Sequence, residues 1–131
     1  MQTKATTPAP EHWLSLELEP RLEAAQMARE LVATACASWH RESLAEPANI
    51  AISELVNNAV LHAGTPLTVQ LATHREELLI AVRDGSTEPL RPRTPAHTSS
   101  GGRGLLLLDA IAASWGCAVR DGGKVVWAVL R

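Results

Sequence analysis

Aromatic side chains are scarce in this chain, whose 131 residues include four tryptophans but no phenylalanine and no tyrosine. The core must therefore be built mainly from leucine, valine, isoleucine and alanine, within an apolar content of 46%. That content is ordinary for a globular protein, and the length suits one domain with one core.

Cysteines, surplus basic charge and long apolar runs are scarce as well. Cys36 and Cys117 lie far apart and match no metal-binding spacing, so we expect two free thiols in a reducing compartment. The net charge of -2 provides no basic surplus for binding nucleic acid. No apolar run is long enough to span a bilayer, and the polar N-terminus does not resemble a signal peptide. We therefore expect a cytoplasmic protein with no membrane and no direct nucleic-acid partner.

The hydrophobic pattern predicts a polar, flexible tail at residues 1–11 and one domain at residues 12–131. The expected elements are a strand at 14–18, helices at 22–39 and about 45–63, strands at 67–71 and 78–82, a helix at 105–115, and a closing hairpin of 117–119 with 125–130. Because hairpins connect most of these strands, we expect an α+β fold. It should be a two-layer sandwich with a mixed, mostly antiparallel sheet and helices on one face.

The segment between the second hairpin strand and the last helix, residues 85–103, differs in composition from the rest of the domain. It holds three prolines, three glycines and several serines and threonines. A loop of this length inside a small domain is usually functional or mobile.

Glu54 and Asn58 lie side by side on the helix expected at about 45–63, because residues four apart are neighbours on a helix surface. They fall at the edge of its apolar face, near the expected seam with the sheet. An asparagine oxygen can ligate Mg²⁺, and a neighbouring carboxylate can orient or deprotonate an attacking hydroxyl. His62, four residues further on, can line the same pocket. Taken alone, the pair fits a solvated helix face better, and His62 fits a surface or packing role better.

Asp84 ends an apolar strand and is followed by Gly85 and Ser86. Its carboxylate can accept the exocyclic amine of adenine, while Gly85 lets a base approach the backbone. An Asp-Gly turn after a strand is the common alternative.

Gly101, Gly102 and Gly104 come just before the helix expected at 105–115. Glycines expose backbone N–H groups, and a helix N-terminus favours phosphate oxygens, to which Arg103 can add a charged donor. The spacing matches neither the Walker A pattern nor the dinucleotide fingerprint. A flexible loop before a helix is an equally good interpretation of this segment alone.

Taken together, these patches resemble the histidine-kinase-like ATPase superfamily, and within it the bacterial anti-sigma-factor serine/threonine kinases and their actinobacterial single-domain relatives. The matching stretches are Glu54 to Ala63, Asp84-Gly85-Ser86 with Pro89, Gly102 to Leu105, and Trp115-Gly116. The resemblance covers nearly everything from residue 12 to residue 131.

The resemblance implies the Bergerat ATP-binding fold, with ATP and Mg²⁺ as ligands and a lid at about residues 85–103. It implies Glu54 as the catalytic base, Asn58 as the Mg²⁺ ligand and Asp84 as the partner of adenine. Val125 stands where relatives often carry a threonine near the adenine. The other residues expected around the nucleotide are His62, Ser86, Gly101, Gly102, Arg103, Gly104 and Leu105.

In the kinase members of this group, the γ-phosphate passes to a serine or threonine of an anti-anti-sigma factor, and a sigma factor is the other partner. The leading hypothesis is therefore an ATP-dependent serine/threonine protein kinase of the anti-sigma type, and kinases of this group often form homodimers. The main alternative is an ATP-sensing binding module that sequesters a protein without phosphorylating it. Val125, which lacks the threonine hydroxyl, favours that alternative. A third is an ATPase fragment that works with a separate sensor.

Overall fold

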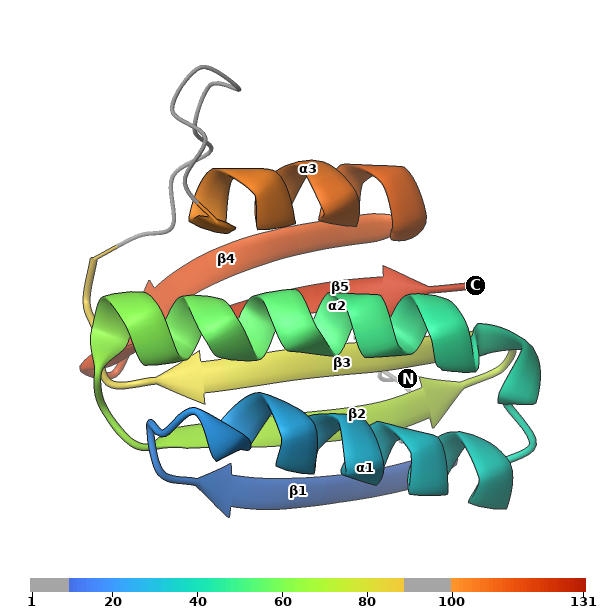
Figure 1. The fold of residues 1–131 in the computed structure, drawn as a ribbon. Helices are drawn as coiled ribbons and strands as arrows, with labels where there is room; N and C mark the ends of the chain where they lie inside the picture. Colours follow the sequence, from blue (N-terminus) through green and yellow to red (C-terminus); the bar gives the residue numbers. More distant parts are fainter. Residues whose placement is uncertain (1–9, 89–99) are drawn as a thin grey trace, which may run out of the picture.

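The computed structural model describes residues 10–88 and 100–131, so residues 1–9 of the expected tail and residues 89–99 of the expected lid lie outside it. The elements are β1 (His12–Leu18), α1 (Glu23–Ser38), the 3-10 helix η1 (Glu42–Leu44), α2 (Ala45–Asn58), the π-helical turn η2 (Ala59–Ala63), β2 (Leu67–His74), β3 (Glu77–Asp84), α3 (Ser100–Ile111), β4 (Ser114–Arg120) and β5 (Gly123–Leu130). Figure 1 shows their arrangement. Their order along the chain is the one expected from the sequence.

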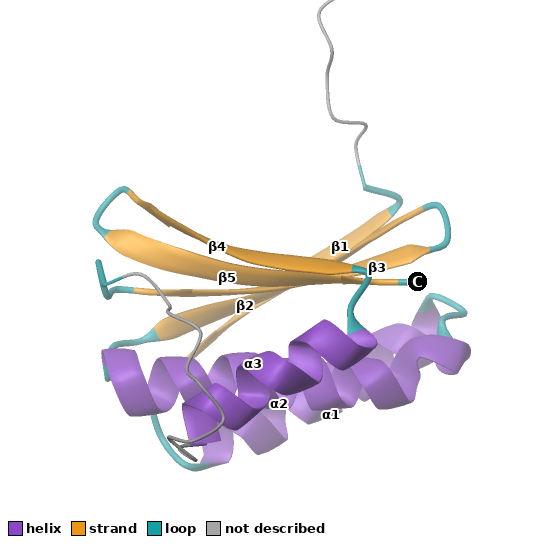
Figure 2. Ribbon diagram, turned by 90° about the horizontal axis from the view of Figure 1, so that it is seen from above, coloured by secondary structure: helices purple, strands orange, loops and turns teal. Residues whose placement is uncertain are grey.

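The five strands form one sheet in the order β1-β2-β3-β5-β4. All four pairings are antiparallel, so the sheet is antiparallel throughout rather than mixed. The sheet is antiparallel because β4 lies at the outer edge and a tight turn connects it to β5. Strand β5 then lies between β3 and β4 and runs antiparallel to both. All three α-helices cover the same face of the sheet, as Figure 2 shows. The expected α+β two-layer sandwich is confirmed.

The core lies between the helices and the covered face of the sheet. Along β2 every second residue is buried, including Leu67, Val69 and Leu71, so one side of the strand faces the helices. The central helix α2 contributes Ile52 and Leu55 from the helix layer. Aliphatic side chains fill this core, as the lack of phenylalanine and tyrosine requires.

The helix that carries Glu54 and Asn58 ends where the sequence predicts. After α2 the chain continues through the π-helical turn η2 to Ala63, and Gly64 closes it with a left-handed φ of 64°. The N–H of Gly64 donates to the carbonyl oxygen of Ala59 at 3.2 Å. Glycine adopts this conformation at little cost, which explains the sharp stop before β2.

The last helix differs most from the expectation of residues 105–115. It begins five residues earlier, at Ser100, and ends at Ile111, so Trp115 belongs to β4 instead. In β4 the Trp115 indole packs against the core and donates a 2.6 Å hydrogen bond to Asp109 of α3. The Ala113 N–H donates to the Val129 carbonyl oxygen, so pairing with β5 takes over after the helix ends.

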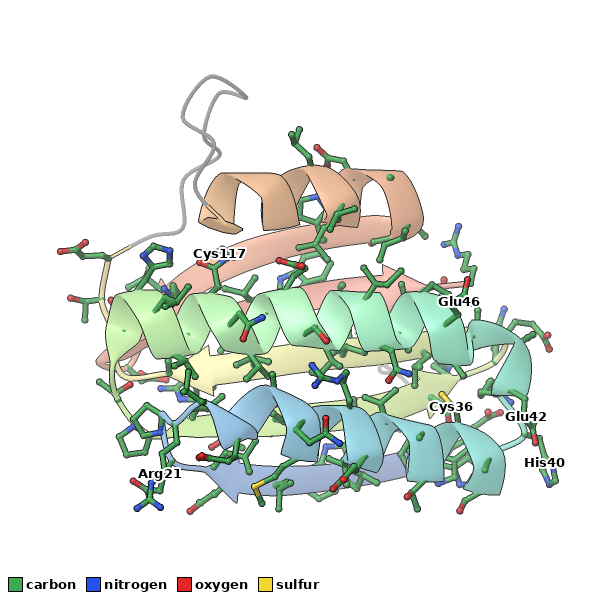
Figure 3. All side chains as sticks on the ribbon, viewed as in Figure 1. Arg21, Cys36, His40, Glu42, Glu46 and Cys117 are labelled. Atoms are coloured by element: carbon green, nitrogen blue, oxygen red, sulfur yellow. The ribbon has the colours of Figure 1, made fainter. Side chains whose placement is uncertain are left out.

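The two cysteines are free thiols, as expected. Cys36 is buried in α1 and Cys117 is half-buried in β4, on opposite sides of α2 in Figure 3. None of the helices described here is both long enough and apolar enough to cross a membrane.

Candidate functional site

The end of η2, the end of β3 and the start of α3 all lie toward the same edge of the molecule (Figure 1). The structure thus brings the helix of Glu54 and Asn58 and the turn after Asp84 to the same region. Helix α2 packs on β3, and η2 also contacts it, so the helix motif lies over the strand that ends in Asp84. Segments about twenty residues apart in sequence therefore form one candidate site.

Asn58 is buried, with 6% of its surface exposed, and its Oδ1 has no hydrogen-bond partner among the described residues. Leaving a buried acceptor unpaired costs about 1–3 kcal/mol, so this atom is suited to a ligand. An amide oxygen is a ligand that Mg²⁺ accepts while it keeps several waters and phosphate oxygens. Within the described residues no group of three or more histidines, cysteines or carboxylates could hold a metal. The Asn58 amide oxygen can supply one ligand to an ion whose other ligands are phosphates and waters.

Glu54 lies one helical turn before Asn58 and is half-buried. Burial removes water from its carboxylate and raises the pKa of Glu54 above the ordinary value of 4.5. A higher pKa makes the carboxylate a stronger proton acceptor, which suits a general base.

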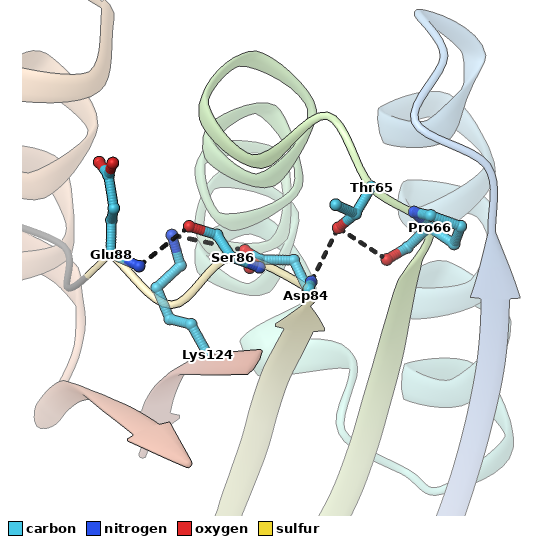
Figure 4. A network of polar contacts seen from close by, with 7 residues as sticks. Thr65, Pro66, Asp84, Ser86, Glu88 and Lys124 are labelled. Carbon is cyan, nitrogen blue, oxygen red and sulfur yellow. Dashed lines mark hydrogen bonds and ion pairs between the residues drawn. The ribbon is translucent and has the colours of Figure 1, made fainter. Parts of the chain in front are cut away.

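The turn after β3 is held by side-chain hydrogen bonds, shown in Figure 4. Asp84 is 4% exposed, and its Oδ1 accepts the N–H of Ser86 at 2.8 Å. The Ser86 hydroxyl oxygen accepts the N–H of Glu88 at 3.1 Å. The N–H of Gly85 donates to Oγ1 of Thr65 at 2.7 Å, which ties this turn to the segment after η2. The segment after β3 is therefore an Asp-Gly turn that also contains a buried carboxylate. The hydrogen bonds of Ser86 stabilise this turn.

The other oxygen of Asp84, Oδ2, lies 3.5 Å from the Nζ of Lys124. Sequence reasoning missed both Lys124 and Thr65. Lys124 was recognisable in principle, because it occupies the position two residues before Val126 in the alternating strand β5, whose buried side faces the helices. Thr65 carries no comparable signal, since its role depends on a contact with a distant turn.

Val125 lies at this edge, but its side chain is on the other face of the sheet. In the β3–β5 register Asp84 pairs with Lys124, and Arg83 pairs with Val125. Neighbouring residues of a strand point to opposite faces, so Val125 projects to the face of the sheet that the helices leave uncovered.

The remaining expected site residues lie in η2 and α3. His62 is exposed in η2, four residues after Asn58. Gly101, Gly102 and Arg103 lie in the first turn of α3 rather than in a loop before it, and Gly104 and Leu105 follow in the second turn. The first N–H groups of a helix have no partner inside it, so the first turn keeps donors available for an anion. The side chains of Arg103 and Leu105 lie outside the described part of the chain.

The antiparallel sheet with its helices on one face is the fold of an ATPase-type nucleotide-binding domain, as comparison with known proteins shows. The profile of the histidine kinase-like ATPase domain matches residues 16–130, and the chain belongs to that family, whose members bind ATP.

Among solved structures, the chain is similar to the crystal structure of the RsbU and RsbW domains of Rv1364c from Mycobacterium tuberculosis. The TM-score is 0.66 at 20% sequence identity, and the match covers 94% of this chain and 32% of the other. This likeness is one of fold, and the chain spans about a third of the mycobacterial one. A search of curated protein sequences found no match.

Proposed function

We propose that this protein is an ATP-dependent serine/threonine protein kinase of the anti-sigma type. One observation carries the proposal: the unpaired, buried Oδ1 of Asn58 lies one helical turn from Glu54, whose pKa is raised by burial. Both stand on the helix that packs over the strand ending in the buried carboxylate of Asp84. A metal ligand and a base serve phosphoryl transfer, and an acceptor for adenine serves recognition of ATP.

In this proposal each residue has a separate task. Asp84 accepts a hydrogen bond from the exocyclic amine of adenine, and Asn58 ligates Mg²⁺, which neutralises charge on the phosphates when bound. Glu54 takes the proton of the partner's serine or threonine hydroxyl. The hydroxyl oxygen then bonds to the γ-phosphorus, the bond to the bridging oxygen breaks, and ADP leaves. His62 lies beside the nucleotide, as does the lid expected at about residues 85–103, which includes Ser86 and the first turn of α3.

The proposed partners are proteins: an anti-anti-sigma factor as the substrate and a sigma factor as the sequestered protein. Homodimerisation also belongs to the proposal. The support is the resemblance of the three motifs to the anti-sigma kinases, together with a fold similar to the mycobacterial structure that contains an RsbW domain. Because these partners and ATP occur in the cytoplasm, the proposal places the protein there.

One observation favours the second candidate, an ATP-sensing module that binds a partner without phosphorylating it. Among the side-chain hydrogen bonds of the described residues, none involves Glu54, so none of these residues fixes its carboxylate by a hydrogen bond.

The test is incubation with γ-phosphate-labelled ATP and Mg²⁺, with candidate partners that carry a serine or threonine, beside titration of ATP by calorimetry. We expect Glu54→Gln to slow transfer by about 10²–10⁴-fold while ATP still binds, because general-base catalysis is worth that much. We expect Asn58→Leu to lose the Mg²⁺-dependent part of ATP affinity. Binding of ATP without transfer to any candidate would favour the module. Absence of ATP binding at millimolar nucleotide and Mg²⁺ would overturn both.

A further inference from the structure

Lys124 places an ammonium group inside the protein, directly beside the carboxylate proposed to bind adenine. It is 4% exposed, as is Asp84, and its Nζ lies 3.5 Å from Oδ2 of Asp84. The two residues are cross-strand partners at the last pair of the β3–β5 ladder. They continue the inward-facing row formed by Val82 and Val126, so both side chains point toward the helix layer.

The surrounding backbone is arranged to bring this lysine close to the end of β3. A Cβ on Gly123 would lie 2.5 Å from the backbone oxygen of Asp84, so only glycine permits this approach before Lys124. On the other face of the sheet, Nη2 of Arg83 donates to the carbonyl oxygens of Arg120 and Asp121 at 3.3 Å each. These bonds hold the β4–β5 turn against β3.

Stability alone is a weak reason for this pair. The cost of removing two charges from water can exceed what a single contact at 3.5 Å returns, and buried ion pairs can often be replaced by apolar residues without loss of stability. Both oxygens of Asp84 are nevertheless engaged, Oδ1 by the Ser86 N–H and Oδ2 by Lys124. The carboxylate is therefore held from two sides, and each oxygen keeps a further lone pair for another donor.

We propose that Lys124 is the positioning residue for base recognition: it holds the Asp84 carboxylate in the orientation that accepts the exocyclic amine of adenine. This inference rests on the proposed ATP site. A carboxylate held in this way favours a purine that carries a hydrogen-bond donor at position 6. It disfavours a purine with an oxygen at that position, because two acceptor oxygens would then face each other with no proton between them. Lys124 thus contributes to the preference for adenine over 6-oxopurines.

The experiment compares the affinities of wild type, Lys124→Met, Lys124→Arg, Asp84→Asn and the double variant Asp84→Asn/Lys124→Met. Each is titrated with ATP, with GTP and with purine riboside triphosphate, which lacks the exocyclic amine. We expect Lys124→Met to weaken ATP binding about tenfold, the scale of one lost hydrogen bond to a charged group. Affinity for purine riboside triphosphate should stay within about twofold, and the ATP-over-GTP ratio should fall. Lys124→Arg, which keeps the charge, should retain much of that ratio.

The double variant tests whether Lys124 acts through Asp84. It also provides a measurement if Lys124→Met does not fold. It carries no buried charge at either position, so its fold does not depend on the ion pair. If Lys124 acts through Asp84, the double variant and Asp84→Asn should bind ATP within about twofold of each other. Arg131→Met, which removes the cation that pairs with Glu77 at the opposite end of the β3–β5 ladder, is the matched control and should leave the ATP-over-GTP ratio unchanged.

Three results would overturn the role of Lys124. One is an equal loss of affinity for ATP and purine riboside triphosphate in Lys124→Met. Another is unchanged ATP affinity in that variant, and the third is a tenfold gap between the double variant and Asp84→Asn. Failure of wild type to bind ATP at all would instead overturn the proposed function, so the two failures are distinguishable.

Discussion

Thr65 and Gly85, separated by twenty positions in the chain, are joined by a 2.7 Å hydrogen bond from the Gly85 N–H to the Thr65 hydroxyl oxygen. Thr65 directly follows the left-handed Gly64 that ends the motif helix, and Gly85 directly follows Asp84. A Cβ on Gly85 would lie 3.2 Å from the same hydroxyl oxygen, so glycine permits the approach. This contact sets the spacing between the Asn58 side and the Asp84 side of the candidate site.

Replacing Thr65 with valine keeps the shape and removes the hydroxyl. We expect Thr65→Val to lower the free energy of unfolding by about 1 kcal/mol, the net value of one neutral hydrogen bond. ATP affinity should fall about three- to tenfold because the two halves of the site lose their fixed spacing. Urea denaturation and calorimetric titration measure the two effects. Thr65→Ser keeps the hydroxyl and should behave like wild type, whereas full ATP affinity in Thr65→Val would show that the contact does not align the site.

The burial of Glu54 predicts a pH dependence of stability. Its pKa is raised above 4.5, so the folded protein binds this proton more tightly than the unfolded chain does. The stabilisation from protonated Glu54 is complete at a pH below the pKa of Glu54 in the unfolded chain. It is lost as the pH rises through the higher pKa of Glu54 in the folded protein. At neutral pH the ionised carboxylate therefore opposes folding, and Glu54→Gln removes that cost.

Thermal melts from pH 4 to pH 8 check this prediction. We expect Glu54→Gln to raise the melting temperature by a few degrees at pH 7, and to raise it less at pH 4. Glu76→Gln, in the exposed turn between β2 and β3, is the control and should show no comparable rise at pH 7. A lower melting temperature for Glu54→Gln at pH 7 would contradict the account of Glu54.

The placement of Val125 can be tested by introducing the hydroxyl group that this side chain lacks. Because Val125 pairs with Arg83 and faces away from Asp84, Val125→Thr should change ATP affinity by less than about twofold. Calorimetric titration with ATP is the measurement. A tenfold gain in affinity would mean that position 125 reaches the adenine, and that the β3–β5 register differs from the one described.

Packing against Trp127 explains why a glycine follows Trp115 in the Trp-Gly motif. Gly116 pairs with Trp127 across β4 and β5, and a Cβ on Gly116 would lie 2.6 Å from Cζ2 of the Trp127 ring. We expect Gly116→Ala to destabilise the protein by about 1–3 kcal/mol in chemical denaturation, the range for overpacking. Adding Trp127→Leu removes the clash, so the double variant should be more stable than the sum of the single effects predicts. Wild-type stability in Gly116→Ala would refute this explanation.

Much of the candidate site was predictable because its signals are local. The helical spacing puts Glu54 and Asn58 on one surface, Gly64 ends the helix, and an apolar alternation leads to Asp84. The bounds of α3 were not predictable in this way, since pairing of Ala113 with Val129 takes Trp115 into β4. Local propensity cannot anticipate the competition between a helix and a strand partner that lies further along the chain.

The chain's order of helices and strands, its aliphatic core and the residues of its helix motif were therefore determined by the sequence itself. Only the tertiary structure decided that Lys124, rather than Val125, lies beside Asp84, and that Thr65 supports the turn at Gly85. The physical reason is strand register: a shift of one residue between β3 and β5 exchanges the two faces of the sheet. That register depends on contacts between segments far apart in the chain, which no local pattern contains.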